Sequence, residues 1–115
     1  MTVTIYHNPR CSKSRATLAL LKARGLKPKI VEYLKTPPSA AELKAILRKL
    51  RIKPRDLLRE CEPCYAELGL KPGTLDDEAL IALMAENPIL IERPIVVAGA
   101  KAALGRPPEK VLEIL

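Results

Sequence analysis

A strand, a helix and a second strand follow one another at the start of the chain, with only short loops between them. Residues Thr2–Tyr6 are rich in β-branched side chains and are followed by the turn-forming His7-Asn8-Pro9. Residues Ser12–Arg24 have the leucine spacing of a helix, and Gly25 is suited to end it. Residues Lys29–Leu34 form the second expected strand. This order predicts a parallel strand pair with a right-handed crossover, and therefore an α/β fold.

An all-helical insertion is expected over about residues 37–87. Ser39 and Glu42 have the spacing of a capping box, and apolar residues then recur at helical intervals. Three further helices are expected at Pro54–Leu58, at Glu62–Leu68 and from about Leu75 to Glu86, the last capped by Thr74.

The C-terminal part contains two short β-rich runs and a last helix. The runs are Ile89–Ile91 and Ile95–Val97, Gly99 marks a turn, and Pro107 and Pro108 are suited to open the helix. The whole pattern is strand-helix-strand, a helical insertion, then strand-strand-helix. It describes a single thioredoxin-like domain, residues 1–115, with a mixed sheet and an all-helical insertion.

Length and cysteine content suggest a cytoplasmic protein. A chain of 115 residues can bury a core without disulfide staples, and an odd count of three cysteines argues against a secreted disulfide framework. No apolar run approaches the ~20 residues of a membrane span, and the N-terminus lacks the regions of a signal peptide. We therefore expect a cytoplasmic protein that does not bind membranes, and we take a monomer as the default oligomeric state.

The charge of the chain predicts an anionic partner. Twenty basic and thirteen acidic residues give a formal charge of +7, which suits nucleic acid, an acidic protein or a small oxyanion. The chain has no Phe or Trp and three Tyr, so it lacks the aromatic platforms on which single-stranded nucleic acid stacks. Binding to nucleic acid is therefore not expected.

Cys11 is the candidate nucleophile because it lies directly before the expected first helix. Free N–H groups and the helix dipole at that end stabilise a thiolate and lower the pKa of a cysteine. His7 and Ser14 add possible hydrogen-bond donors to this loop. The alternative is that Cys11 is a small buried hydrophobic residue.

Four blocks of the sequence resemble the glutaredoxin-linked arsenate reductase family, and they occur in that family's order. They are His7–Arg15 (HNPRCSKSR), Leu57–Arg59 with Tyr65–Leu70, Asn87–Ile95 (NPILIERPI) and Gly105–Leu112 (GRPPEKVL). The resemblance implies a thioredoxin-like fold and a thiol-dependent reduction of arsenate to arsenite. It implies glutathione as co-substrate and glutaredoxin as partner, with no bound cofactor and no metal.

The resemblance also assigns roles to single residues. Cys11 matches the family's nucleophile, and His7 matches the position that helps to hold it as a thiolate. Pro94 matches a proline that is cis in thioredoxin-like folds. Three arginines match the oxyanion-binding positions: Arg59, Arg93 and Arg106. Guanidinium groups bind tetrahedral oxyanions bidentately, although any of these arginines could instead be a solvated surface charge.

The cysteines depart from related patterns in two places. Ser14 occupies the second cysteine position of a Cys-x-x-Cys motif, so Cys11 has no local resolving partner and an external thiol is favoured. A separate Cys-x-x-Cys is formed by Cys61 and Cys64. These two residues could resolve a Cys11 intermediate and permit coupling to thioredoxin, could be packing residues, or could bind zinc with Cys11 and His7.

Two other functions remain open from the sequence. The same fold resembles the Spx-type regulators, which bind RNA polymerase and sense disulfide stress, although Ser14 removes their second cysteine. The second alternative function is that of a generic thiol-transfer protein without arsenate activity. The densest basic stretch, Lys44–Arg55, is expected to be a solvated face, or else a docking surface for an acidic redoxin or another acidic protein.

Overall fold

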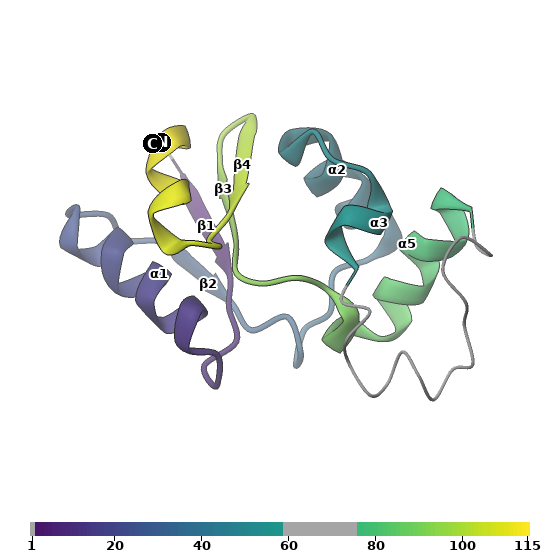
Figure 1. The fold of residues 1–115 in the computed structure, drawn as a ribbon. Coiled ribbons are helices and arrows are strands. Elements are labelled where there is room, and N and C mark those ends of the chain that lie inside the picture. The colour runs from purple at the N-terminus through teal and green to yellow at the C-terminus, as the bar shows by residue number, and fades with distance from the viewer. Residues whose placement is uncertain (1, 59–75) are drawn as a thin grey trace. The chain divides into compact units, whose positions relative to one another are not determined.

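The computed structural model describes residues 2–58 and 76–115 (Figure 1). These form two compact units. The sheet unit comprises residues 1–36 and 93–115, and the helical unit comprises residues 37–92.

The sheet unit contains one four-stranded mixed sheet with the strand order β2-β1-β3-β4. Its strands are β1 (Val3–Tyr6), β2 (Lys29–Val31), β3 (Ile95–Ala98) and β4 (Lys101–Leu104). Strand β1 pairs in parallel with β2 and antiparallel with β3, and β3 pairs antiparallel with β4. The predicted parallel pair and the mixed sheet are therefore confirmed.

Helix α1 (Ser12–Ala23) is the predicted crossover between β1 and β2. Gly25 follows it with a φ of 77°, the left-handed region in which glycine is favoured. Strand β2 is shorter than expected and ends at Val31. The chain turns there because the N–H groups of Lys35 and Thr36 both donate to the Glu32 carbonyl oxygen.

The core of the sheet unit lies between the sheet and its helices. Helix α1 packs against η2 (Pro108–Ile114), and η2 also packs against β4. The fully buried side chains at this junction are Ile5, Leu21, Val96 and Val111. Each such side chain contributes about 1.5–3 kcal/mol by its removal from water. The expected C-terminal helix is present, as a 3-10 helix.

The predicted strand Ile89–Ile91 is wrong. Residues Pro88–Leu90 form a 3-10 helix, η1, and Ile91 alone pairs with Leu58 in an isolated bridge. A short apolar run fits either structure, and Pro88 favours the first turn of a helix. The hairpin is instead made by β3 and β4, joined at Gly99. Strand β4 was missed because its sequence, KAAL, has low strand propensity.

The helical unit begins with the predicted capping box. Helix α2 (Ala40–Leu50) is capped by Ser39, whose Oγ accepts from the Glu42 N–H (3.1 Å), while Glu42 Oε1 accepts from the Ser39 N–H (3.4 Å). Such caps contribute about 1 kcal/mol. Helix α3 (Pro54–Leu57) follows, with proline at its first position as expected.

The last helix of this unit, α5 (Asp77–Glu86), begins later than predicted. Its cap is Asp76, whose carboxylate accepts from the Ala79 N–H at 2.8 Å. The residues proposed for an earlier start, together with the expected helix Glu62–Leu68, lie outside the described residues. No helix among residues 2–58 and 76–115 is both long and apolar enough to cross a membrane.

Candidate active site

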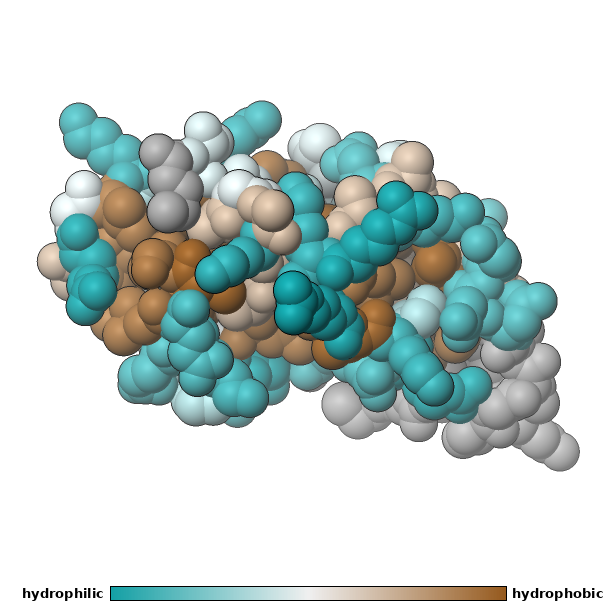
Figure 2. Space-filling model, turned by 90° about the horizontal axis from the view of Figure 1, so that it is seen from above, coloured by the Kyte–Doolittle hydropathy of each residue, from teal (hydrophilic) through white to brown (hydrophobic). Residues whose placement is uncertain are grey.

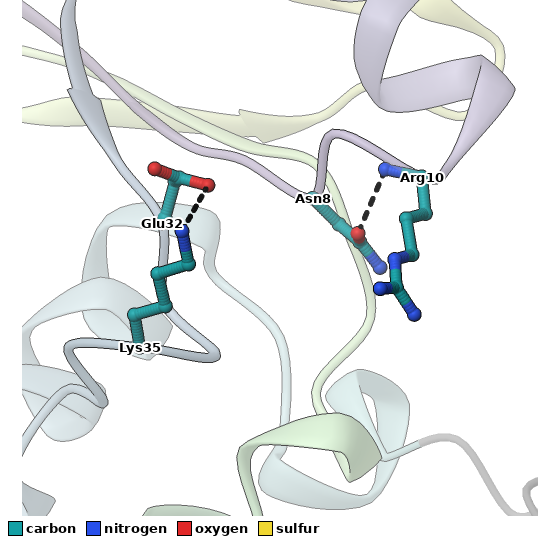
Figure 3. Close-up of polar contacts among 4 residues, drawn as sticks. All are labelled: Asn8, Arg10, Glu32 and Lys35. Carbon is teal, nitrogen blue, oxygen red and sulfur yellow. Dashed lines mark hydrogen bonds and ion pairs between the residues drawn. The ribbon is translucent and has the colours of Figure 1, made fainter.

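The loop between β1 and α1 is a tight turn that places Cys11 at the start of the helix. The Cys11 N–H donates to the Asn8 carbonyl oxygen (3.0 Å), and the Arg10 N–H donates to Asn8 Oδ1 (3.0 Å; Figure 3). Asparagine side chains often stabilise turns in this way. Cys11 itself has an extended backbone, with φ −91° and ψ 123°, and is the residue that precedes the first helical turn.

The Cys11 thiol is free, half-buried and acidic for a cysteine. Burial raises its pKa, but hydrogen bonds from the N–H groups of Ser14 and Lys13 and the charge and hydrogen bond of Arg93 outweigh that effect, so the net pKa is below the ordinary value. The thiolate is the reactive form of a cysteine. The loop therefore favours a nucleophile at Cys11.

Ser14 connects the cysteine loop to His7. The Ser14 hydroxyl lies 2.6 Å from His7 Nδ1 and accepts from the Asn8 N–H at 3.0 Å. The side chains of His7 and Ser14 are buried. Ser14 thus contacts the sulfur through its backbone N–H, whereas its hydroxyl is engaged by His7 and Asn8.

His7 is held toward its neutral form. Burial lowers the pKa of its imidazole, the nearby Glu32 carboxylate raises it, and the charges of Arg15 and Lys22 lower it, with a net value below 6.5. A neutral imidazole can accept a hydrogen bond from the Ser14 hydroxyl at Nδ1. His7 therefore supports the loop through Ser14.

Two of the predicted arginines lie together at the start of β3. Arg93 precedes β3 and lies close enough to Cys11 to lower the thiol pKa. Arg106 follows β4, and its Nε donates to the Arg93 carbonyl oxygen at 2.7 Å. The hairpin thus brings the Arg106 guanidinium group against the backbone of Arg93, thirteen residues away in the sequence.

Pro94 and Gly105 pack closely beside these arginines. The Arg93–Pro94 peptide bond is cis, the isomer that the family resemblance implies, and Arg106–Pro107 is also cis. The Gly105 N–H donates to the Pro94 carbonyl oxygen at 3.0 Å. A Cβ atom at Gly105 would collide with Thr17 Oγ1 and lie 2.7 Å from Pro94 Cγ. Only glycine fits here without a shift of its neighbours.

The surroundings of Cys11 are strongly cationic. Arg10, Lys13 and Arg15 are exposed, and the first turn of α1 contains no acidic residue. Cations at the N-terminal end of a helix oppose its dipole, so this arrangement lowers the stability of α1. It suits a bound anion, whose charge offsets both the cations and the dipole.

Three of the predicted site residues lie outside the described residues. They are Arg59, Cys61 and Cys64. Among the described residues, no cluster of three or more His, Cys, Asp or Glu side chains could hold a metal ion. The zinc alternative requires Cys61 and Cys64, and so does the alternative of a resolving pair.

Some residues of the site were not predicted from the sequence. The sequence predicts only a loop at Asn8, but both its side chain and its carbonyl oxygen shape the turn at Cys11. The Asn-Pro dipeptide is a signal that could have identified it. Gly105 belongs to a block that resembles the family, but the sequence predicts no role for it, because its closeness to Thr17 arises only in three dimensions.

Comparisons with known proteins agree on the family. The model of the ArsC family matches residues 6–114. An uncharacterized Escherichia coli (strain K12) protein, YfgD, is 56% identical over 98% of this chain and 96% of its own length. An arsenate reductase of Neisseria meningitidis is 49% identical over 98% of this chain and 97% of its own.

A solved structure supports the fold. The structure of an arsenate reductase from Vibrio cholerae has a TM-score of 0.96, is 54% identical, and covers 100% of this chain and 98% of that one. The mixed sheet with its helices is the thioredoxin-like arrangement expected from the sequence. The chain therefore belongs to the ArsC family.

Proposed function

We propose that this protein reduces arsenate to arsenite with electrons from thiols and that Cys11 is its nucleophile. The observation that carries the proposal is the position of Cys11 directly before α1, where the Ser14 and Lys13 N–H groups and Arg93 lower its pKa against the opposing effect of burial. Relatives about half identical over nearly the whole chain, such as that of Neisseria meningitidis, carry the name arsenate reductase. They support the choice of substrate.

In the proposed first step, the Cys11 thiolate attacks arsenic. A sulfur–arsenic bond forms, an arsenic–oxygen bond breaks, and the oxygen leaves as water after protonation. Arg93 and Arg106 stabilise the charge on the arsenate oxygens, since guanidinium groups remain charged at any working pH. The family resemblance assigns the same role to Arg59, whose position lies outside the described residues.

In the proposed second step, a glutathione thiolate attacks the Cys11 sulfur. A disulfide bond forms, the sulfur–arsenic bond breaks, and its electron pair stays on arsenic, which is reduced from As(V) to As(III). The two sulfur atoms supply the two electrons. A glutaredoxin thiol then takes over the glutathionyl group and restores the Cys11 thiol. The reaction requires no bound metal or organic cofactor.

The identity of the reductant depends on whether Cys61 or Cys64 takes part in the reaction. With Ser14 in place of a second nearby cysteine, an external thiol is the simplest electron donor. If Cys61 or Cys64 attacked the Cys11 adduct instead, the oxidised product would be an internal disulfide, which thioredoxin reduces. The two routes leave different sulfur products and can be separated by experiment.

The test is arsenate-dependent oxidation of NADPH by the purified protein. It is run in parallel with glutathione plus glutaredoxin and with thioredoxin plus its reductase. We expect turnover with the first system, loss of turnover in Cys11→Ser, and normal turnover in Ser12→Ala, a matched change at the neighbouring position. Turnover that survives in Cys11→Ser, or no turnover in either system, would overturn the proposal.

A double variant identifies the route. Cys61→Ser/Cys64→Ser should leave turnover with glutathione and glutaredoxin unchanged. Turnover that requires thioredoxin and is lost in the double variant would replace glutathione by the internal pair. Mass spectrometry of the trapped product separates the two routes: a glutathione adduct on Cys11 marks the first, and an internal disulfide marks the second.

A further inference from the structure

Thr17 is a completely buried polar side chain that the proposed reaction has not used. It lies on the second turn of α1, on the same buried face of the helix as Ser14 and Leu21. In the sheet unit, at the left of the view from above, hydrophilic side chains project outward around hydrophobic ones (Figure 2). Thr17 instead lies in the interior, so its hydroxyl needs a partner within the protein.

The Thr17 hydroxyl has that partner in the backbone of the preceding turn. Its Oγ1 donates to the Lys13 carbonyl oxygen at 2.8 Å, the usual length of an O–H···O hydrogen bond. Threonines in helices commonly satisfy their hydroxyl in this way. The functional meaning of the bond therefore depends on which peptide group accepts it.

The accepting peptide group is one that contacts the Cys11 sulfur. The Lys13 carbonyl and the Ser14 N–H belong to the same planar peptide group, and that N–H donates to the sulfur. A chain of hydrogen bonds thus leads from the Thr17 hydroxyl through a single peptide group to Cys11. A hydrogen bond accepted by the carbonyl polarises the peptide group, which makes its N–H a stronger donor.

The backbone at Gly105 holds the Thr17 side chain in place. A Cβ atom at Gly105 would collide with Thr17 Oγ1 and lie 3.2 Å from Thr17 Cγ2. The Gly105 backbone therefore lies against both the hydroxyl and the methyl group of Thr17. A threonine in a helix can adopt two side-chain rotamers, and this contact restricts the change between them. The contact thus favours the rotamer in which the hydroxyl bonds to the Lys13 carbonyl oxygen.

We propose that Thr17 is a positioning residue for the nucleophile: its hydroxyl orients and polarises the Lys13–Ser14 peptide group, which in turn stabilises the Cys11 thiolate. The inference rests on the proposed function, in which Cys11 is the attacking group. In a merely structural role, the Thr17 hydroxyl would satisfy itself on the carbonyl and the methyl group would fill space. Removal of the hydroxyl would then leave the ionisation of Cys11 unchanged.

Variants at position 17 separate the hydroxyl from the methyl group. Thr17→Ser keeps the hydroxyl, Thr17→Val keeps the methyl group, and Thr17→Ala has neither. They are made in the Cys61→Ser/Cys64→Ser background, where Cys11 is the only thiol, and thiolate absorbance is followed against pH.

We expect the acid dissociation constant of the Cys11 thiol to fall in the variants without a hydroxyl. The expected fall in Thr17→Val and Thr17→Ala is roughly two- to threefold, because polarisation contributes about 10–30% of a hydrogen bond to a charged group. Thr17→Ser should stay near the parent value. Any other grouping of the three variants would overturn the proposal. If Thr17→Val did not fold, the comparison of Thr17→Ser with Thr17→Ala would decide alone.

Urea unfolding of the same proteins separates an effect on the thiol from a loss of stability. Thr17→Ser should be less stable than the parent, because it lacks the buried methyl group, and yet keep the parent titration curve. Thr4→Val makes the same hydroxyl-to-methyl change on β1 and should leave the titration unchanged. A dissociation constant that followed the free energy of unfolding across all these variants would contradict a positioning role.

The pH profile of Cys11 alkylation gives a second readout. Because the thiolate is the reacting form, the midpoint of the profile should move to higher pH in Thr17→Val and Thr17→Ala, and the plateau should not fall. A lower plateau with an unchanged midpoint would show reduced access to the sulfur and would overturn the proposal. Neither measurement uses arsenate, so failure of this inference and failure of the proposed reduction are distinguishable.

Discussion

The Nε–H of Arg106 donates a 2.7 Å hydrogen bond to the backbone carbonyl oxygen of Arg93. The bond joins the residue after β4 to the residue before β3, at the open end of the hairpin. Arg93 in turn lowers the pKa of Cys11 through its charge and a hydrogen bond. Arg106 therefore holds the backbone of the residue whose side chain stabilises the thiolate.

Replacement of Arg106 by lysine tests this positioning. Lys keeps the positive charge but has no planar fork and no Nε–H at this distance along the side chain. We expect kcat/KM for arsenate to fall about 10- to 100-fold, which corresponds to the roughly 1.5–3 kcal/mol of a hydrogen bond to a charged group. Lys110→Arg, an exposed change of the same type, is the control. An Arg106→Lys enzyme with unchanged kcat/KM would show that charge alone suffices.

The acidity of Cys11 depends on Arg93, and this can be measured directly. In a Cys61→Ser/Cys64→Ser background, Cys11 is the only thiol, and its ionisation can be followed by thiolate absorbance against pH. We expect an apparent pKa below the ordinary ~8.5 of a cysteine and a rise in that pKa in Arg93→Met, because the variant removes the charge and hydrogen bond that favour the thiolate.

Arg10→Met is the matched control for this measurement. It removes the same charge from the residue next to Cys11, but Arg10 is exposed and is not among the groups that lower the pKa of the thiol. Its titration curve should lie close to that of the parent protein. If both variants shifted the curve equally, the acidity of Cys11 would reflect the general positive charge of the loop.

The parts of the fold that the sequence predicted have strong local signals. The Ser39 capping box and the αL glycine Gly25 are set by backbone chemistry within a few residues, and both were confirmed. The run Ile89–Ile91 has no such signal, since its apolar pattern fits a strand or a helical turn equally well. Strand β4 forms because it pairs with β3, although its own sequence favours a strand only weakly.

The residues of the candidate site also fall into those with a local sequence signal and those that only the fold brings together. Cys11 was identifiable because a cysteine directly before a helix has a distinctive chemistry. The joint position of Arg93 and Arg106 is a property of the β3–β4 hairpin, and no local pattern in the sequence contains it. For Ser14, the sequence suggested a hydrogen-bond donor in the cysteine loop, and the structure assigns its backbone N–H to sulfur and its hydroxyl to His7.

The burial of His7 predicts a dependence of stability on pH. Because its folded pKa is lowered by burial, the unfolded chain binds the proton more tightly than the folded protein. With His7 neutral in both states, above the unfolded pKa of about 6.5, its burial costs no protonation free energy. As the pH falls below about 6.5 and through the folded pKa, the unfolded chain takes up the proton first, and the free energy of unfolding decreases. Urea unfolding between pH 7.5 and 5 should show this loss.

His7→Asn is the control for the pH dependence, because the asparagine amide can replace Nδ1 as a partner of the Ser14 hydroxyl but does not titrate. The variant should lose less stability than the parent between pH 7.5 and 5. Parallel stability curves for the two proteins, or an imidazole pKa above 6.5 in an NMR titration, would contradict the neutral His7.

The close packing at Gly105 predicts that Gly105→Ala affects both stability and the thiol. The added Cβ would collide with Thr17 Oγ1 and lie 2.7 Å from Pro94 Cγ, so the free energy of unfolding should fall by about 1–3 kcal/mol. Pro94 follows Arg93, so a shift there should also slow alkylation of Cys11 at neutral pH.

Gly25→Ala is the comparison, since its added Cβ would have no neighbour within 4 Å but Gly25 has a φ of 77°. It should lose about 1 kcal/mol from backbone strain alone and keep the parent alkylation rate. Slower alkylation in both variants would mean that the rate follows global stability. Normal alkylation in Gly105→Ala would show that the packing at Gly105 does not affect Arg93 and Cys11.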